Sequence, residues 1–207
     1  MNESTTMLRQ ADEHEMQTTM PDLLAAQELL KQDRAQGLAA LNSLFRAGTL
    51  PHPHLDGRYA GELVALDIAP GLTRLFQTMT TLWMPWLGKS FNSAWQQGSN
   101  LFSNDSRFLA QLFNPLYRGF TADRPGTYRG FTFRTYTAPG LADPDRTVLK
   151  IDYDLENNPS LTIRRVLDEL VQLTEGLYLG KAHVHWWWGH WQTVAYFTLS
   201  SEKTSFS

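Results

Sequence analysis

Residues 146–199 decide the fold class of this 207-residue chain, with the sequence RTVLKIDYDLENNPSLTIRRVLDELVQLTEGLYLGKAHVHWWWGHWQTVAYFTL. Short runs rich in β-branched and aromatic residues alternate here with turn residues, a pattern typical of a β-meander. The last two runs flank a turn around Gly189 and are long enough to pair with each other. We therefore expect a mainly β protein in which these strands close a sheet or a barrel.

Residues 162–173, TIRRVLDELVQL, fit two structures. As a helix, the segment would gather four apolar side chains on one face: Ile163, Val166, Leu167 and Leu170. As a strand, it would alternate between two faces, with Asp168 and Glu169 on opposite sides. The turn at residues 174–176 and the strand after it favour a strand for the latter half.

The earlier part of the chain supplies further elements. Residues 57–68, GRYAGELVALDI, alternate between two faces and predict the first strand. Residues 72–83 carry apolar side chains at helical spacing until Pro85, which predicts one helix after the first strand. Residues 89–102, KSFNSAWQQGSNLF, predict a second strand, and residues 107–120 and 127–137 predict further β structure.

Strict alternation within residues 127–137 places Arg134 on the same face as Tyr128, so Arg134 could point into the barrel. A buried guanidinium needs an anionic partner. Asp152 or Asp154 on the following strand could supply it, as could the carboxylates of the DEL segment.

The N-terminal part divides into a polar tail and a helical segment. Residues 1–20 show no sustained period and predict a flexible tail, whereas residues 21–48 carry a leucine-rich apolar stripe. Gly48 is placed to end this segment, and Gly37 could divide it into two helices. We expect the helices to plug one end of the barrel, with a partner-binding role as the alternative. The barrel itself is expected to span residues 55–200.

Composition excludes several classes of protein. The net charge of −3, without blocks of like charge, argues against a nucleic-acid partner. The chain has no cysteine, and its start lacks the apolar core of a signal peptide. No run of 18 apolar residues occurs, so stable membrane insertion is not expected. These features favour a cytoplasmic protein, and a homodimer stays open. The 12% aromatic content suits a packed barrel interior or an aromatic-lined cavity.

Four segments resemble an uncharacterised group of small bacterial proteins with lipocalin-like, calycin-type β-barrels. They are DGRYAGELVAL at 56–66, WLGKSFN at 86–92, VLKIDYDLENNP at 148–159 and VLDELVQLTEGLYLGKAH at 166–183. The resemblance covers residues 55–199 and implies a lipocalin-like meander rather than a particular activity. This chain departs from the pattern at Glu175-Gly176, where the group has Pro-Gly, and residues 96–145 look enlarged by an aromatic-rich insertion.

Histidines are the candidate metal ligands. His183 and His185 would share one face of a strand, and His190 could join them across the Gly189 turn. A divalent metal or a haem would use these three residues, although rim histidines among tryptophans explain the motif more simply. His52 and His54 adjoin prolines, with Asp56 as the one nearby carboxylate, and make a weaker candidate. Our main expectation is a site without a cofactor.

Ionic and aromatic residues are the candidate ligand-binding residues of the barrel. If several of them point inward, they would form a polar floor beneath an apolar mouth. The set comprises Arg58, Tyr59, Lys89, Arg134, Asp152, Asp168, Tyr178, Trp186 and Tyr196. No common hydrolase, kinase or dehydrogenase motif is present, and no catalytic residue can be assigned from a motif.

We therefore expect a barrel that binds a hydrophobic small molecule such as a fatty acid, polyketide or isoprenoid. A cofactor-independent isomerase or cyclase using acid or base groups of the same cavity is the alternative. Asp152, Asp168, Lys89 or Arg134 would then supply those groups. An interaction protein that uses residues 22–47 is the third hypothesis.

Overall fold

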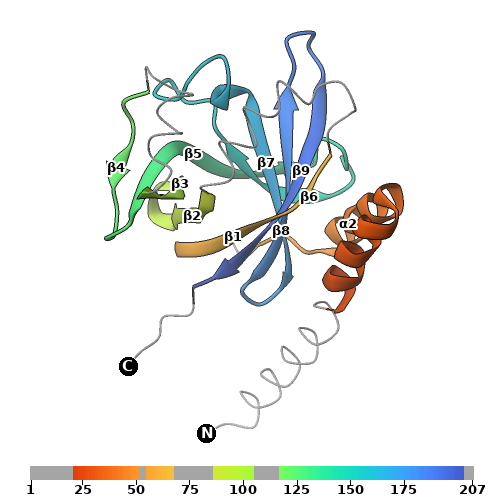
Figure 1. Cartoon of the computed structure of the whole chain (residues 1–207). Helices are drawn as coiled ribbons and strands as arrows, with labels where there is room; N and C mark the ends of the chain where they lie inside the picture. The colour runs from red at the N-terminus through yellow and green to blue at the C-terminus, as the bar shows by residue number, and fades with distance from the viewer. Residues whose placement is uncertain (1–20, 52–54, 68–85, 105–116, 203–207) are drawn as a thin grey trace, which may run out of the picture.

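The computed structural model describes residues 21–51, 55–67, 86–104 and 117–202, and shows a closed antiparallel barrel of eight strands (Figure 1). The mainly β prediction is therefore confirmed. Neighbouring strands pair from β3 through β2, β1, β9, β8, β7 and β6 to β5, and pairing of β3 with β5 closes the barrel. The strands are β1 Gly57–Leu66, β2 Trp86–Asn92, β3 Gln97–Ser103, β5 Thr127–Pro139, β6 Thr147–Asp152, β7 Val166–Thr174, β8 Leu177–His185 and β9 Trp191–Ser201, and the short β4 Thr121–Ala122 is added beside β5.

The predicted C-terminal meander is present as β6 to β9. Residues 162–173, which fitted two structures, form a 3₁₀ turn at Ile163–Arg165 followed by β7. This segment forms a strand and not a helix because β6 and β8 pair with it on both sides. Gly189 lies in the predicted turn between β8 and β9, where its N–H donates to the Trp186 carbonyl at 2.9 Å.

One further sequence prediction needs correction, and several others lie outside the described residues. Residues 89–102 form parts of two strands, because a 3₁₀ turn at Ser93–Trp95 separates β2 from β3. The Asn92 side chain accepts from the Trp95 N–H at 3.3 Å and stabilises this turn. The helix predicted at 72–83, the tail at 1–20, and His52 and His54 lie outside the described residues, as does most of 107–120.

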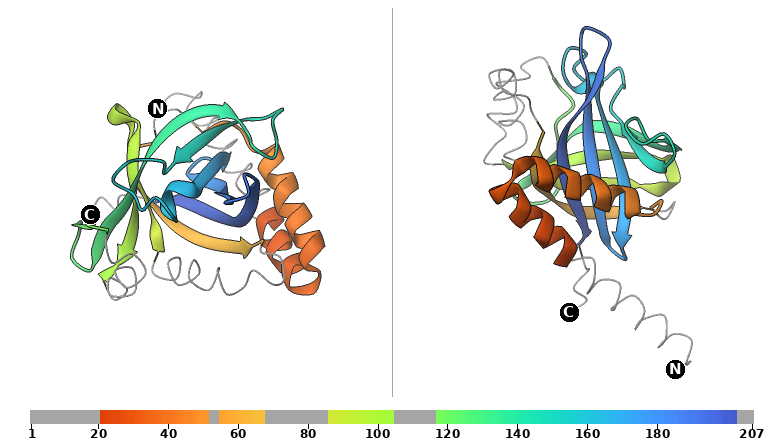
Figure 2. Two further views of the ribbon diagram at one scale, coloured as in Figure 1. Left: turned by 90° about the horizontal axis from the view of Figure 1, so that it is seen from above. Right: turned by 90° about the vertical axis from the view of Figure 1, so that its right-hand side faces the viewer.

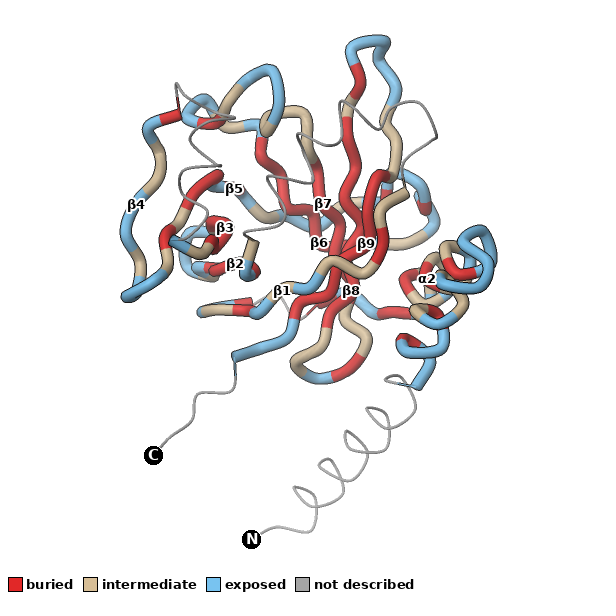
Figure 3. The backbone as a smooth tube through the Cα atoms, viewed as in Figure 1, coloured by how far each residue is buried: buried red, intermediate tan, exposed pale blue. Residues whose placement is uncertain are grey.

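Aromatic side chains fill the barrel interior. The buried core contains 31 hydrophobic residues across the described chain, and the β6–β9 wall carries many of them (Figure 3). Tyr59 packs edge-to-face against Phe91 and Tyr178, with ring centroids 5.4 and 5.5 Å apart. Such contacts fix neighbouring strands relative to each other, which accounts structurally for much of the aromatic content.

The N-terminal segment contains two helices, as predicted, but they are divided at a different residue. Residues 21–32 are helical, and α2 spans Arg34–Ala47. Asp33 lies between them and accepts from the backbone N–H of Ala35 at 2.9 Å, so it is the N-cap of α2. Gly37 lies inside α2 instead, where a Cβ would come within 2.5 Å of the Leu30 backbone. It therefore allows the two helices to pack closely.

The helices cover the outer wall of the barrel and do not plug its end (Figure 2). Phe45 of α2 packs with Val148, Val171 and Leu179 on the outward faces of β6, β7 and β8. The plug prediction was wrong because these outward positions are apolar and need a cover. The apolar stripe of α2 is consequently used within the chain. No helix in the described part of the chain has the length and apolarity needed to cross a bilayer.

A buried ionic cluster, which we call the outer-wall cluster, lies on the same wall. It consists of Lys150, Glu169, Lys181, His183 and Asp143. Lys150 donates to Glu169, and Lys181 donates to Asp143. Lys181 also donates to the Asn42 side chain of α2 at 2.6 Å, and Arg46 of α2 donates to Asp143 at 2.7 Å. The cluster therefore joins α2 to the barrel wall and to the β5–β6 loop.

Removing one partner from this cluster should destabilise the fold strongly. We expect Asp143→Ala to lower the free energy of unfolding by about 3 kcal/mol, because the Lys181 ammonium would stay buried without its carboxylate. Asp145→Ala is the matched control, since Asp145 also pairs with Arg46 but is 59% exposed in its side chain. Its cost should be far smaller, because water already solvates both charges of an exposed pair. Urea unfolding measures both, and equal costs would contradict the role given to the cluster.

The cluster also predicts a dependence of stability on pH. Burial alone would raise the pKa of Glu169, but its interactions with His183, Lys150 and the Leu141 N–H outweigh burial and lower the pKa to about 2. A lowered folded-state pKa stabilises the protein above the usual value of 4.5, and this contribution is lost as the pH falls toward 2. Glu169→Gln should therefore flatten the loss of stability between these pH values, as measured by urea unfolding at each pH. An unchanged slope would contradict the prediction.

Candidate functional site

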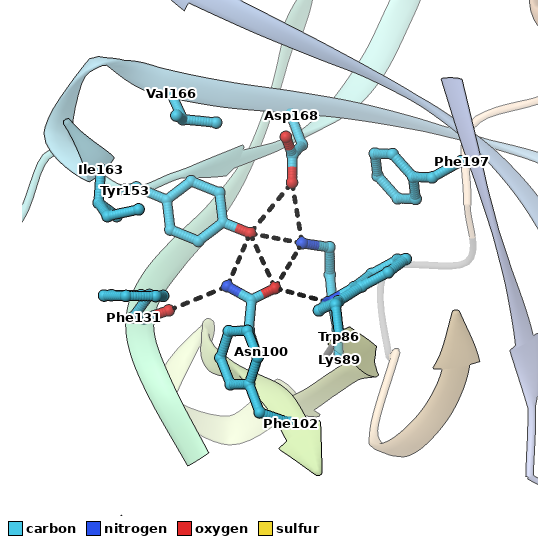
Figure 4. Close-up of a pocket in the computed structure, with 10 residues that line it drawn as sticks. All are labelled: Trp86, Lys89, Asn100, Phe102, Phe131, Tyr153, Ile163, Val166, Asp168 and Phe197. Carbon is cyan, nitrogen blue, oxygen red and sulfur yellow. Dashed lines mark hydrogen bonds and ion pairs between the residues drawn. The ribbon is translucent and has the colours of Figure 1, made fainter. Parts of the chain in front are cut away.

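A cavity of about 60 Å³ lies inside the barrel (Figure 4). Apolar side chains form most of its described lining, and four side chains with polar groups lie among them. The lining residues are Trp86, Lys89, Asn100, Phe102, Phe131, Tyr153, Ile163, Val166, Asp168 and Phe197. Trp86, Ile163 and Val166 are half-buried, so they form the part of the lining nearest to solvent.

Four polar groups converge at one side of this cavity. The Lys89 Nζ donates to Asp168 Oδ2 at 2.8 Å and to Asn100 Oδ1 at 2.9 Å, and it also contacts the Tyr153 hydroxyl. That hydroxyl donates to Asp168 Oδ2 at 3.0 Å. The Trp86 indole N–H donates to Asn100 Oδ1 at 3.0 Å. We call Lys89, Asn100, Tyr153 and Asp168 the polar tetrad (Figure 4).

A β-bulge on β2 places Trp86 and Lys89 on the same inner face. The two residues are three apart, so regular alternation would turn them to opposite faces. The register instead shifts between Trp86 and Gly88, and Lys89 then pairs directly with Asn100 of β3. Gly88 has a φ of +139°, and a Cβ there would lie 2.0 Å from the Tyr59 carbonyl oxygen. Only glycine fits at this bulge.

A second irregularity, on β5, shapes the opposite part of the lining. Phe131 has a φ of +50°, and the pairing with β3 skips it, since Ser99 pairs with Thr132 and Asn100 with Gly130. The Phe131 carbonyl accepts from Asn100 Nδ2 at 3.3 Å, while its N–H donates to the Tyr117 hydroxyl at 2.6 Å. A phenylalanine with positive φ is uncommon, and these two bonds help hold it there.

The bulge at Phe131 also corrects the prediction for Arg134. Because one extra residue interrupts the alternation, Tyr128 and Phe133 both face the core, and Arg134 turns outward. Asp152, one of the carboxylates considered as its partner, accepts from Arg134 at Oδ2 over 2.8 Å. The ion pair lies on the outside of the barrel, where the Arg134 side chain is 54% exposed.

Burial and charge set the ionisation of the tetrad. Burial lowers the pKa of the Lys89 ammonium below its usual range, although the Asp168 carboxylate acts in the opposite direction. Burial and then the Asp168 charge raise the pKa of Tyr153 well above its usual value, so the phenol stays protonated. Four aromatic rings surround the Lys89 Nζ at centroid distances of 5.1 to 5.5 Å. Their faces favour a cation at this position.

One acceptor at the cavity has no partner within the described residues. Asp168 Oδ2 accepts from both Lys89 and Tyr153, whereas the buried Asp168 Oδ1 accepts no hydrogen bond from the described part of the chain. A buried carboxylate oxygen without a donor is unfavourable by about 1–3 kcal/mol or more. As far as the described residues show, this oxygen is therefore open to a hydrogen-bond donor.

Of the nine ligand-binding residues predicted from the sequence, the structure brings two, Lys89 and Asp168, into the described lining. Tyr59, Tyr178 and Trp186 belong to the packed core. The others lie on the outer surface of the barrel: Arg58 pairs with Asp123 and Glu202, Arg134 pairs with Asp152, and Tyr196 packs with residues of the N-terminal helices. The described lining thus contains fewer of these polar residues than the sequence predicted.

Asn100 and Tyr153 were missed by the sequence analysis. Tyr153 follows the inward Ile151 at a spacing of two, so the β6 alternation could have identified it. Asn100 could not be found in this way, because residues 89–102 were predicted to form one strand and the pairing of Lys89 with Asn100 depends on the turn between β2 and β3.

The three candidate metal ligands lie in different surroundings. His183 is buried in the outer-wall cluster, where Nε2 lies 3.1 Å from Glu169 Oε2, off the line of a good hydrogen bond, and Nδ1 lies 3.2 Å from the Thr193 hydroxyl. His185 stacks on Trp191, and His190 is exposed at the turn. Within the described ranges, no three His, Cys, Asp or Glu side chains are grouped to hold a metal ion. The metal and haem hypotheses stay predictions.

The fold and the cavity define an antiparallel β-barrel with an internal polar tetrad. No protein-family model matches the chain, and no curated protein matches it. A crystal structure of a protein from Thermomonospora curvata is similar to it at 12% sequence identity and a TM-score of 0.49, over 88% of this chain and 99% of that one.

The Lys89–Asp168 pair should behave as one energetic unit. We expect Lys89→Met and Asp168→Leu each to lower the free energy of unfolding by about 3–5 kcal/mol, because each leaves a buried charge unpaired. The double variant should lose much less than the sum of the two, since it buries no charge at this pair. A double-mutant cycle by urea unfolding tests this.

The matched control for this cycle is the exposed pair of Glu28 and Lys31, whose charged atoms are 3.0 Å apart on one helix. Alanine substitutions there should be additive within about 0.5 kcal/mol. If the stability costs of the substitutions at the buried pair were as additive as those at the exposed pair, the interaction assigned to Lys89 and Asp168 would be wrong.

Proposed function

We propose that this barrel binds a compact, largely apolar small molecule that carries a neutral oxygen group. The observation that supports the proposal best is the cavity itself, where aromatic walls enclose the Lys89–Asp168 pair and an unused Asp168 oxygen. A ligand carbonyl would accept from Lys89 or Tyr153, and a ligand hydroxyl would donate to Asp168 Oδ1. Few polar groups among apolar walls are typical of sites that orient one end of a ligand.

Charge balance favours a neutral ligand over a carboxylate. Lys89 and Asp168 neutralise each other at 2.8 Å, so the site has no spare positive charge. A carboxylate ligand would add a second buried anion beside Asp168, at a desolvation cost of several kcal/mol. Among the ligand types expected from the sequence, neutral polyketide-like or isoprenoid-like molecules therefore fit better than fatty acids.

The volume of the cavity also favours a small ligand over a fatty acid. A volume of 60 Å³ corresponds to about two water molecules, whereas sites for drug-sized ligands measure about 300–1,000 Å³. A long acyl chain would require the lining to move. A small ring, or the end of a larger neutral molecule entering past Ile163 and Val166, needs less rearrangement.

A cofactor-independent isomerase or cyclase is the second candidate function. It is favoured by the position of Asp168 Oδ2, which contacts both an ammonium and a phenol at the cavity. A carboxylate base next to two donors is suited to proton transfer beside a carbonyl group. The binding proposal requires only that the ligand occupies this position, and the enzyme proposal requires turnover in addition.

Binding can be tested with small probes. We expect cyclopentanone and cyclopentanol to raise the Tm and to shift the NMR signal of the Trp86 indole N–H, because both carry a neutral oxygen group. Cyclopentanecarboxylate should do neither at the same concentration, owing to its charge. Equal effects of all three probes, or no effect of any, would contradict the proposal.

Two substitutions locate the binding site. Val166→Phe should fill the cavity and weaken binding of cyclopentanol at least about tenfold, or about 1.4 kcal/mol. Leu161→Phe is the matched control, because Leu161 lies in the preceding loop, is 71% exposed and does not line the cavity. Equal affinities of the two variants would place the ligand elsewhere.

A further inference from the structure

We infer that Lys89 forms an imine with an aldehyde or ketone ligand, which makes the cavity a covalent carbonyl-binding site. This inference rests on the proposed function and deepens it, because it names the reactive atom and the class of ligand. The nucleophile is the Lys89 Nζ, which reaches the cavity from β2. Lysine amines in apolar surroundings are the residues that form Schiff bases with carbonyl compounds.

Lys89 differs from the other buried lysines in what it can contact. Lys150 and Lys181 lie on the outer wall, paired with Glu169 and Asp143, and neither lines the cavity. The Lys89 Nζ instead faces a space large enough for a small carbonyl compound. Its environment is also suited to a neutral amine, because burial lowers the pKa of Lys89.

Asp168 and Tyr153 supply the proton transfers. Lys89 first gives one proton to Asp168 Oδ2, which lies 2.8 Å away. The freed lone pair attacks the carbonyl carbon, and the carbonyl oxygen takes the proton from Asp168, directly or through the Tyr153 hydroxyl, giving a carbinolamine. The nitrogen gives up a second proton, the C–O bond breaks, and water leaves. Of the three ammonium protons, two leave in this water and one stays on the iminium nitrogen, so no oxidant or reductant is needed.

The product preserves the charge balance of the site. An iminium ion replaces the ammonium ion beside the Asp168 carboxylate, so the pair stays neutral as a whole and no additional buried charge arises. The rings of Trp86, Tyr153, Phe133 and Phe197 surround this nitrogen and favour a cation in either state. A carbonyl ligand can thus be held by a covalent bond at little electrostatic cost.

Reductive trapping tests the inference. The full-length protein is incubated with butanal and sodium cyanoborohydride near neutral pH, digested, and mapped by mass spectrometry. We expect a butyl adduct at Lys89 that forms at least about tenfold faster than at the exposed Lys31, because the cavity holds the aldehyde beside the Lys89 Nζ, whereas Lys31 lies on the surface. Cyclopentanol should slow this adduct by competition. A rate at Lys89 no greater than at Lys31 would overturn the inference.

Variants separate the covalent step from binding. Lys89→Arg retains the positive charge and should abolish the adduct at position 89, whereas Lys150→Arg, the matched change on the outer wall, should leave the Lys89 adduct unchanged. The comparison of lysines within the unmodified protein remains decisive even if Lys89→Arg does not fold. Cyclopentanol binding without preferred trapping at Lys89 would overturn the imine alone. If neither cyclopentanol nor butanal bound, both the imine and the proposed function would be contradicted.

Discussion

Two successive carboxylates of β7 set the central constraint on this structure, since Asp168 and Glu169 point to opposite faces of one barrel wall and both are buried. Each must be neutralised on its own side. Lys89 reaches Asp168 from inside, and Lys150 reaches Glu169 from outside. The inner pair defines the cavity, and the outer pair belongs to the cluster that holds α2 and the β5–β6 loop. Strand β7 therefore links the candidate site to the covering of the barrel.

The site itself depends on two interruptions of regular strand geometry. The bulge at Gly88 brings Trp86 and Lys89 to one face, and the left-handed Phe131 allows its carbonyl to meet Asn100. Both lie in strands that border β3, the strand that carries Asn100. Irregular backbone positions of this kind often occur near functional sites. Here they have a specific effect, because they bring the Trp86 indole N–H and the Phe131 carbonyl to the Asn100 side chain.

Much of the architecture could be predicted from local pattern. Alternation and turn residues identified β1 and the meander from β6 to β9, and the polar spacing of residues 166–173 placed Asp168 and Glu169 on opposite faces. Asp152 was one of several carboxylates predicted to pair with Arg134. The outward direction of the Arg134 side chain was not predicted, since a single bulge reverses every later side chain in a strand and leaves little mark in the sequence. The same effect concealed the shared face of Trp86 and Lys89.

A mainly β chain with N-terminal helices can be predicted from the residues alone, because periods of two and of three to four residues are local properties of the chain. The sequence also determined which side chains can ionise. The tertiary structure alone decided where those charges lie: Lys89 with Asp168 inside, Arg134 with Asp152 outside, and His183 in the outer-wall cluster. These outcomes follow from strand register and bulges, which bring together residues as distant as 89 and 168, and no local pattern encodes such a pairing.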